Sequence, residues 1–458
     1  MKIAIFTDTY APEINGVVTS IKNFTKLLGD KGHEIMIYCP KYDSEDNEVH
    51  KNIKIKRLFA VSFINNKDVR VAIPSPFTII NELRKFKPDI VHIQTPMTIG
   101  CVALAAAKMM GLKNIQTYHT YIPGDMVYLM PKAMPNVNKI LDNSLKYLNV
   151  IKNLKPAKKA SETPKTIKSR NRNMMNDAFA WTVTRAIYNR ADLIITPTEI
   201  VKNELKNHGI GPEIKVLSNG VDLSVIVKKS DYSPQKRILH GGRLGFEKSV
   251  DVALGAFGIL AASDKDVVLD IASDGPARGK LEKMVTRLKL EDRVNFLGFL
   301  PRKDLNTLYV KYDFLINAST METQGLVILE AMAAGLSVLG VNKLAAPELI
   351  KEGVNGYLSA LFNENQMAEN MKKMSEQMQQ SIESMQQQQM EMDMQSTRQI
   401  LENLIKISFD QEELLNKTKG VNVYNPLYLQ LMQDQYKLID DISIVEDSIQ
   451  ELSKRVSQ

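Results

Sequence analysis

Two carboxylates, Glu322 and Glu330, stand on either side of the pair Gln324-Gly325. The apolar run at residues 314–317 is typical of a buried strand, and good helix formers follow Gly325. The expected helix therefore opens near Gln324-Gly325, where its first backbone N–H groups lack carbonyl partners and can bind an anion. A sugar nucleotide requires this combination, because its hydroxyls need acceptors and its diphosphate needs donors.

Two basic side chains follow another expected strand, at residues 237–240. The turn Gly241-Gly242 leads into Arg243 and Lys248, and a helix is expected from there through residue 262. A glycine-rich turn that carries Arg and Lys before a helix can hold a diphosphate. When a nucleoside diphosphate departs, negative charge develops, and two fixed cations with helix amides can stabilise it without a metal.

Taken alone, two glutamates at this spacing occur in any helix-rich chain, with one near a helix start and one on its solvated side. The longer pattern at residues 322–335, Glu-Thr-Gln-Gly-Leu-Val-Ile-Leu-Glu-Ala-Met-Ala-Ala-Gly, resembles the donor-site signature of retaining glycosyltransferases of family 4, which have the GT-B fold. The resemblance implies that Glu322 contacts the transferred sugar and Glu330 holds the nucleotide ribose. It further implies that Arg243 and Lys248 hold the diphosphate.

The resemblance also assigns backbone and helix-start positions to the nucleotide-sugar donor. The turn at Gly298, Phe299 and Leu300 would contact the nucleobase through its backbone, so uridine and guanosine donors cannot be told apart from side chains. The helix start would bind the donor, and Gly16, just before a helix at residues 17–28, would allow close backbone approach to a phosphate. The members of that helix start are Gln324, Gly325 and Leu326.

The first half of the chain offers an acceptor-side candidate after the strand expected at residues 114–117. His119 follows this strand end, where ligands gather in open α/β sheets, although a lone histidine is more often structural. The order His-Thr-Tyr followed by an acid resembles the lipid-modifying subgroup that includes 1,2-diacylglycerol 3-glucosyltransferases. By that resemblance His119 lies beside the transferred sugar, and Asp125 is a candidate partner of the acceptor hydroxyl.

Strand and helix patterns alternate along most of the chain, which predicts an α/β protein with doubly wound parallel sheets. No G-x-G-x-x-G follows the first strand, so a dinucleotide cofactor is not expected. The expected architecture is GT-B, with two Rossmann-like domains facing a cleft and an α-helical C-terminal extension. The predicted boundaries are 1–222 for the acceptor domain, with a basic insertion at 131–175, then 223–374 for the donor domain and 375–458 for the tail.

The chain of 458 residues has a formal net charge of +7 at pH 7. Residues 131–175 hold eleven Lys or Arg against two acids, and part of this segment has an apolar helical face. The segment is either a solvated insertion or an anchor for anionic lipid, and a lipid acceptor favours the anchor. Nucleic acid is not expected as a partner, because aromatic side chains are scarce in this segment.

No secretory signal, bilayer-spanning run or disulfide framework is evident, so a cytoplasmic protein is expected, peripheral at the inner face of the cell membrane. The tail departs from the family pattern. Residues 371–395 contain fifteen Met or Gln out of twenty-five, a composition unlike that of a helix that closes the donor domain. Residues 428–456 carry an apolar seam at alternating spacings of three and four, which predicts a self-associating coiled coil, a helical hairpin or a helix docked on its own chain.

The resemblance to family 4 implies a retaining, metal-independent hexosyltransferase that uses UDP-glucose or GDP-mannose as donor, with no cofactor. The expected acceptor is a hydroxyl of 1,2-diacylglycerol or a related membrane lipid. Two alternatives stay open. One is a mannosyltransferase acting on a phosphoinositide or a soluble glycan, and the other is an inactive scaffold that binds sugar nucleotides and oligomerises through its tail.

Overall fold

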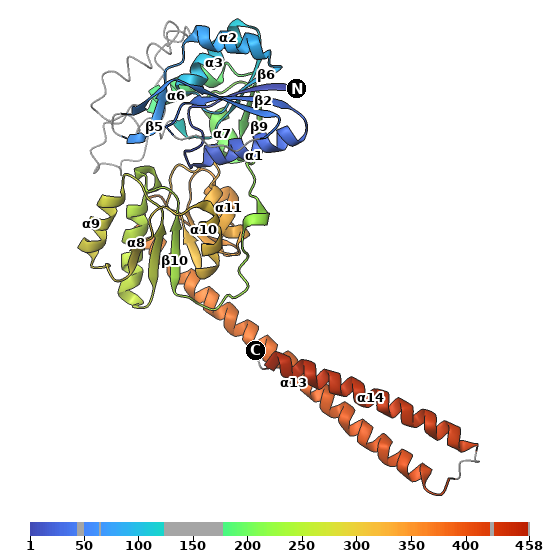
Figure 1. The fold of residues 1–458 in the computed structure, drawn as a ribbon. Helices are drawn as coiled ribbons and strands as arrows, with labels where there is room; N and C mark the ends of the chain where they lie inside the picture. Colours follow the sequence, from blue (N-terminus) through green and yellow to red (C-terminus); the bar gives the residue numbers. More distant parts are fainter. Residues whose placement is uncertain (44–49, 64–65, 123–176, 422–425, 457–458) are drawn as a thin grey trace. The chain divides into compact units, whose positions relative to one another are not determined.

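A computed structural model describes residues 1–43, 50–63, 66–122, 177–421 and 426–456 (Figure 1). The chain forms two compact units, Met1–Ser375 and Glu376–Gln458. The first unit contains two parallel sheets with their helices, and the second contains only helices. The two units are described separately below.

The N-terminal sheet has seven parallel strands in the order β3-β2-β1-β6-β7-β8-β9. Their bounds are Ile53–Leu58, Glu34–Pro40, Lys2–Phe6, Ile90–Ile93, Lys113–Thr117, Leu193–Thr196 and Ile214–Val216. The order reverses beside β1, which makes the carboxyl ends of β1 and β6 the point where a ligand crevice opens.

Both faces of the N-terminal sheet are covered by helices. These are α1 (Gly16–Asp30), α2 (Pro76–Phe86), α3 (Thr98–Met109), α6 (Asp177–Tyr188) and α7 (Glu199–Asn207). Ala4 and Phe6 of β1 pack with α2 and α3, whereas Ile3 and Ile5 pack with α1. Side chains of a strand alternate between faces, so a strand that is apolar at every position must be buried on both.

The second sheet has six parallel strands in the order β12-β11-β10-β13-β14-β15. Their bounds are Val294–Phe296, Val268–Ala272, Arg237–Gly241, Phe314–Ile316, Ser337–Val341 and Gly356–Ser359. The helices are α8 (Val250–Ser263), α9 (Arg278–Leu288), α10 (Arg302–Leu308), α11 (Leu326–Ala333) and α12 (Ala346–Leu349). Ile238 and Leu239 of β10 enter separate apolar clusters, so this sheet too is covered on both faces.

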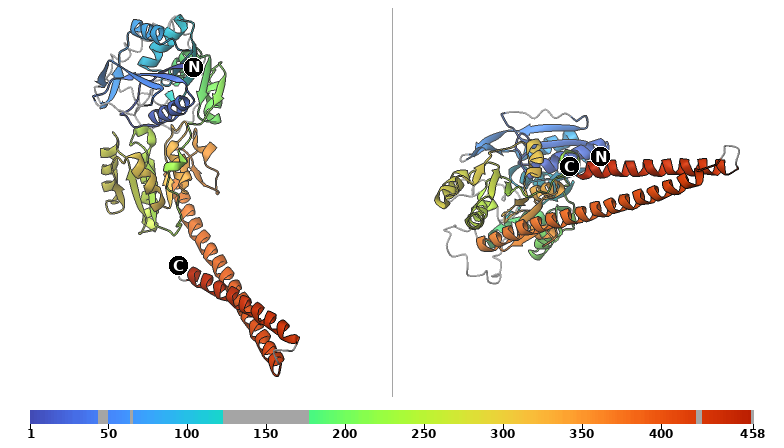
Figure 2. Two further views of the ribbon diagram at one scale, coloured as in Figure 1. Left: turned by 45° about the vertical axis from the view of Figure 1, so that its right-hand side comes forward. Right: turned by 90° about the horizontal axis from the view of Figure 1, so that it is seen from below.

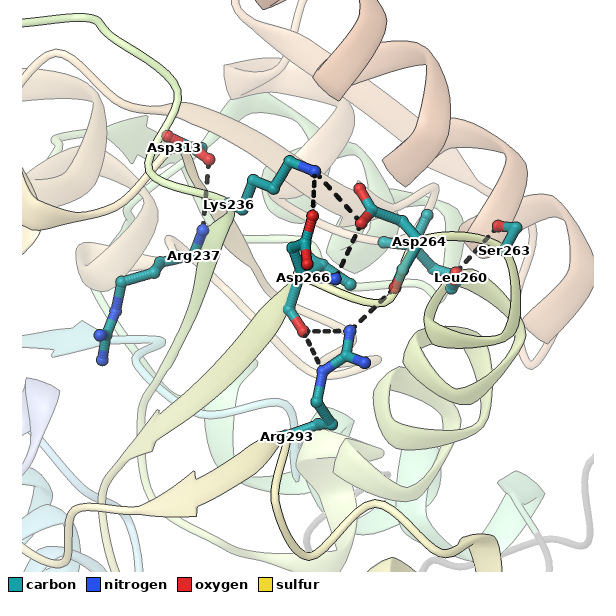
Figure 3. A network of polar contacts seen from close by, with 9 residues as sticks. Lys236, Arg237, Leu260, Ser263, Asp264, Asp266, Arg293 and Asp313 are labelled. Atoms are coloured by element: carbon teal, nitrogen blue, oxygen red, sulfur yellow. Dashed lines mark hydrogen bonds and ion pairs between the residues drawn. The ribbon is translucent and has the colours of Figure 1, made fainter.

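Polar contacts hold the amino ends of these strands together, at the edge of the sheet opposite the strand carboxyl ends (Figure 3). Arg293 donates to the Val267 carbonyl from Nε at 2.8 Å and to the Asp264 carbonyl from Nη2 at 2.8 Å. Lys236 pairs with Asp266 at 2.9 Å and with Asp264 at 3.4 Å. These contacts tie the end of α8 to β10 and β12, a structural role that leaves the carboxyl ends for binding.

Most of the expected elements are present within one or two residues of their predicted bounds, including the strand-loop-helix-strand unit β13-α11-β14. Three strands between residues 53 and 72 were not predicted. They are the edge strand β3 and the antiparallel pair β4 (Ala60–Phe63) and β5 (Asn66–Ala72). Their alternation of apolar and charged residues is the pattern of half-exposed strands rather than of buried ones.

Residues 371–395, predicted to lead into a helical Met/Gln-rich tail, are helical, and their first residues also pack on the donor sheet. They lie within one continuous helix, α13 (Glu364–Thr418), and the start of that helix does close the donor sheet. Met367, Met371 and Met374 are buried in the same cluster as Ile238. Unbranched Met and Gln are good helix formers, and Met fills irregular gaps, so low sequence complexity here is compatible with a packed helix.

The second unit is a helical hairpin of α13 and α14 (Leu427–Val456) (Figure 2). Ile407 of α13 is buried with Leu438 and Val445 of α14, and Ile400 and Leu414 pack against the same cluster. Of the three forms predicted for the tail, the structure has the hairpin. The seam at residues 428–456 is therefore used within the chain.

Candidate active site

Loops at the carboxyl ends of both sheets supply the site, and the acceptor side begins with His119. His119 follows β7, and its Nε2 lies 2.5 Å from Oε1 of Gln94, which follows β6. The Gln94 amide nitrogen lies 3.2 Å from Nε2 of His92, and that atom lies 2.8 Å from the Thr117 hydroxyl. Because an amide oxygen only accepts, His119 carries its proton on Nε2, and Nδ1 is left as an acceptor.

These two histidines are neutral at physiological pH. Burial, with a smaller contribution from the neighbouring His92, lowers the pKa of His119 to about 3. Burial alone lowers the pKa of His92 to about 4. A neutral His119 can accept a hydrogen bond from a hydroxyl group or take its proton, whereas an imidazolium could do neither.

Glu322 lies in the loop between β13 and α11, where it pairs with Lys248 at 2.5 Å. Burial acts to raise the pKa of Glu322, but the Lys248 charge together with hydrogen bonds from Ser319 and Asn317 holds that pKa below its usual value. Glu322 is therefore an anion at neutral pH, and its carboxylate can accept hydrogen bonds from sugar hydroxyls.

Arg243 and Lys248 lie in the segment between β10 and α8. Gly242 has φ of 118°, a conformation that glycine adopts without strain, and a short 3-10 helix, Phe246–Lys248, follows. The Arg243 side chain is exposed and forms no ion pair within the described residues. In this segment Lys248 is therefore already paired with Glu322, whereas the exposed Arg243 can bind an anion.

The start of α11 is held by the N-terminal domain. Asn219 donates its backbone N–H to Oε1 of Gln324 at 3.2 Å, and the Gln324 amide nitrogen donates to the Ser218 hydroxyl at 2.6 Å. Gly325 has φ of 72°, and Leu326 begins the helix. The first helical amides therefore have no carbonyl one turn earlier. A Cβ on Gly16, at the start of α1, would lie 3.6 Å from Leu326, so α1 and α11 begin side by side.

Glu330 is buried one turn further along α11, and its oxygens are already in contact with other side chains. Arg302, the first residue of α10, pairs with Oε1, and the Tyr309 hydroxyl donates to Oε2 at 3.3 Å. Burial raises the pKa of Glu330, while the Arg302 charge and the Tyr309 hydrogen bond oppose that rise. Arg302 also donates to the Thr19 hydroxyl of α1 at 2.8 Å, so it bridges the two domains.

The predicted nucleobase turn follows β12. Gly298 has φ of 73°, Phe299 is 54% exposed, and Leu300 packs against the cluster that contains Tyr309. The turn thus presents backbone and one aromatic face to solvent directly before Arg302. A turn of this kind can stack on a base and bond its edge through the main chain.

Two threonines join the acceptor side to the Glu322 loop. The Thr323 hydroxyl donates to the His119 carbonyl, and the Thr198 hydroxyl donates to the Thr323 carbonyl at 3.1 Å. The predicted acceptor and donor residues are thereby brought together, at the facing carboxyl edges of the two sheets. Asp125 and the basic segment at residues 131–175 lie outside the described residues.

Sequence reasoning did not single out Gln94, Arg302 or Thr323. Each contacts a residue on a different element, and no local pattern marks such a partner in advance. Arg302 had one weak signal, its place two positions after the predicted nucleobase turn. In the described parts of the chain, no group of acidic, His or Cys side chains is arranged to hold a metal ion, and no helix is long and apolar enough to cross a membrane.

Comparisons with known proteins agree with this geometry. The model of Glycosyltransferase Family 4 matches residues 14–225, and that of Glycosyl transferases group 1 matches residues 225–390. An alpha-monoglucosyldiacylglycerol synthase of Streptococcus pneumoniae is 27% identical over 80% of this chain and 77% of that protein. A GDP-mannose-dependent alpha-mannosyltransferase of Corynebacterium glutamicum is 27% identical over 78% of this chain and 76% of that protein.

The fold has solved counterparts. The structure of Anabaena Alr3699/HepE in complex with UDP and glucose superposes with a TM-score of 0.58 at 18% identity, covering 84% of this chain and 91% of that one. The predicted fold is confirmed as GT-B, two Rossmann-like domains flanking a cleft with a helical C-terminal extension. The chain belongs to the glycosyltransferases of family 4.

Proposed function

We propose that this glycosyltransferase moves a glucosyl group from UDP-glucose to a hydroxyl of 1,2-diacylglycerol or a related membrane lipid, with retention at the anomeric carbon. The observation that carries the proposal is the anionic Glu322 held by Lys248 in the loop before α11, with Arg243 of the same segment as Lys248 exposed and in no ion pair among the described residues. One cleft edge then offers an acceptor for sugar hydroxyls next to cations and amides for a diphosphate.

In the proposed reaction the bond from the anomeric carbon to the diphosphate oxygen breaks, a bond to the acceptor oxygen forms, and the acceptor hydroxyl passes its proton to the departing diphosphate, which leaves as UDP. Glu322 orients the sugar. Arg243, Lys248 and the amides from Gln324 to Leu326 stabilise the charge that develops on the leaving diphosphate, so no metal is required. Gly16, without a side chain, lets the start of α1 approach the diphosphate closely.

The nucleoside and the acceptor occupy the remaining positions. Glu330 accepts from the ribose hydroxyls, and the turn from Gly298 to Leu300 contacts the base. His119 lies beside the transferred sugar, with Nδ1 as an acceptor. Asp125 is proposed as a partner of the acceptor hydroxyl on the sequence pattern alone.

The acceptor class is argued from the names of two relatives, and the location follows from that acceptor. Two relatives, from S. pneumoniae and Acholeplasma laidlawii, carry the name alpha-monoglucosyldiacylglycerol synthase, and that name favours a lipid acceptor. A lipid acceptor has to be met at a bilayer surface, so we propose peripheral attachment at the inner face of the cell membrane through residues 131–175. Because that contact is electrostatic, attachment should weaken with rising salt.

A mannosyl donor is the second candidate, because the C. glutamicum relative is named a GDP-mannose-dependent mannosyltransferase. Backbone contacts at residues 298–300 would not separate the two nucleotides by side-chain chemistry. The inactive scaffold of the sequence analysis is disfavoured, because binding alone does not require an ionised carboxylate held at the sugar position.

The experiment offers UDP-glucose and GDP-mannose, each with diacylglycerol in mixed micelles, to wild type and to Glu322→Gln. We expect glucolipid from UDP-glucose, a rate at least 100-fold lower for Glu322→Gln, and little change in UDP affinity. Glu213→Gln, an exposed carboxylate outside the site, is the control and should match wild type. The anomeric proton coupling of the product tests retention.

Each other outcome has a definite meaning. Formation of mannolipid from GDP-mannose, with no glucolipid from UDP-glucose, would show that the donor is GDP-mannose. Nucleotide binding without any turnover, for both donors, would favour the scaffold. A Glu322→Gln variant as active as wild type would refute the role given to that carboxylate.

A further inference from the structure

One face of the hairpin formed by α13 and α14 is apolar and uncovered. We call it the open face. It consists of six large side chains, each between 37% and 64% exposed. They are Leu401, Leu404, Leu415, Met432 and Ile439, with Tyr436 at the outer edge of the face, two positions before the core residue Leu438.

The register of the hairpin places these residues together. On α13, Leu401 and Leu415 each follow a core residue by one position, Ile400 and Leu414. On α14, Met432 and Ile439 follow the buried Leu431 and Leu438 in the same way. One position is about 100° of rotation about the helix axis. In an antiparallel pair the same rotation turns both helices toward the same side, so the four side chains share one face.

The opposite side of the hairpin differs in composition. The positions just before the core residues are Gln399, Lys406 and Glu413 on α13 and Gln430 and Lys437 on α14, with Ile444 as the exception. Ser408 and Glu446 are the polar positions on the open side. A two-helix layer that is polar on one side and aliphatic on the other is half of a bundle.

We propose that the open face pairs with the open face of a second copy of this chain, forming a four-helix bundle that makes the enzyme a dimer. The open-side positions on both helices recur every seven residues, apolar except at Ser408 and Glu446, and this is the spacing that lets side chains of one layer enter the gaps of another. A twofold contact uses the same patch on both copies, so no separate partner surface is needed.

Charge and area favour a second copy over a bilayer. Residues 376–458 carry fourteen acidic against seven basic side chains, whereas helices that lie on anionic membranes are rich in Lys and Arg. Half-exposed side chains of this size leave on the order of 100 Å² each to be covered. Six of them give about 600 Å² per copy, or about 1,200 Å² in all, the lower limit of specific protein interfaces.

The test is the mass of the full-length protein by light scattering after gel filtration. The chain is 51.6 kDa, and twice that mass is expected for wild type. Leu401→Glu/Ile439→Glu buries charge in the proposed interface and should give the monomer mass. Gln399→Glu/Gln430→Glu adds the same charge on the polar side and should remain dimeric. Circular dichroism checks that helix content is equal in all three.

A cysteine variant keeps the test valid if the double glutamate variant unfolds the hairpin. The two native cysteines, Cys39 and Cys101, are buried. Ser408→Cys on the open face should form an interchain cross-link with a short bismaleimide, and Gln430→Cys on the polar side should not. A monomeric wild type, a dimer that survives Leu401→Glu/Ile439→Glu, or cross-linking from the polar side alone would each overturn the proposal. A monomer that binds neutral vesicles through the open face would assign that face to lipid instead.

Discussion

At the scale of single residues, the site depends on partners that set protonation states. Gln94 presents an oxygen to His119, which places the proton on Nε2, and burial keeps the imidazole neutral. Lys248 does the converse for Glu322, since it holds a partly buried carboxylate in its charged form. The position of the proton on His119 and the charge on Glu322 are thus set by neighbours on other loops.

The substitution Gln94→Glu tests the protonation state of His119. A carboxylate in place of the amide would favour the imidazolium and raise the pKa of His119 from about 3 toward its ordinary range. Nδ1 would then become a donor and lose its proposed role as acceptor. We expect a turnover rate in Gln94→Glu that falls about tenfold for each pH unit below the new pKa, where wild type shows no such fall.

The measurement is the turnover rate at saturating donor, between pH 5.5 and pH 8, for wild type and Gln94→Glu. UDP affinity, measured across the same range, should be equal in the two proteins, because His119 lies on the acceptor side. Identical pH profiles would show that the His119 protonation state does not govern the rate.

At the scale of elements, β13, α11 and the loop between them are the part of the site that sequence defines best. Alternation of apolar strands with helix formers predicted the unit, and the positive φ of Gly325 explains the glycine that ends the loop. The partners of its carboxylates could not be predicted, because Lys248 and Arg302 reach them from the β10–α8 segment and from α10. Such contacts depend on how separate elements pack.

The variant Gly325→Ala tests the conformation of this loop. At φ of 72° a Cβ would strain the backbone, and it would lie 2.9 Å from Cδ1 of Ile328, so that side chain would have to move. We expect a loss of about 1–2 kcal/mol in stability from the left-handed conformation alone. UDP affinity should fall as well, because the helix-start amides move.

The matched control is Gly279→Ala in α9, where no atom lies within 4 Å of the added carbon. That variant should be neutral or slightly stabilising, because alanine is the better helix former. Thermal unfolding and UDP titration on both variants provide the measurement. Equal UDP affinity in Gly325→Ala and Gly279→Ala would argue against a donor role for the start of α11.

At the scale of the whole molecule, the two sheets meet through short polar contacts rather than a broad apolar core. Besides the contacts of Thr323 and Gln324, the Glu348 carboxylate accepts from the backbone amides of Glu199 and Ile200 at 3.2 and 3.0 Å. Sequence periodicity predicts the sheets, because it records which faces are buried. It carries no signal for a carboxylate on α12 that caps a helix in the other domain. Periodicity also left three forms open for the tail, because an apolar seam on one helix does not show which surface packs against it.

Both domains contain a buried histidine that should make the folded protein less stable at acid pH. Burial lowers the pKa of His92 and of His240, each to about 4, from an ordinary 6.5. Between pH 6.5 and 4 the unfolded chain binds protons that the folded chain does not, so stability falls as pH falls. At pH 5 each histidine should remove about 2 kcal/mol of unfolding free energy relative to pH 7. Below pH 4.5 the loss of charge on Glu322, whose pKa is lowered, adds to the same trend.

Trp181, the single tryptophan, is buried in the same domain as His92 and reports its unfolding by fluorescence. The urea midpoint of wild type should drop between pH 7 and pH 5 at constant ionic strength. In His92→Gln, whose side chain can still bond the Thr117 hydroxyl, the drop should be smaller by the equivalent of about 2 kcal/mol. An equal drop in both proteins would mean that His92 is not the buried neutral group that this structure gives, and the hydrogen bonds that orient Gln94 toward His119 would then need a different arrangement.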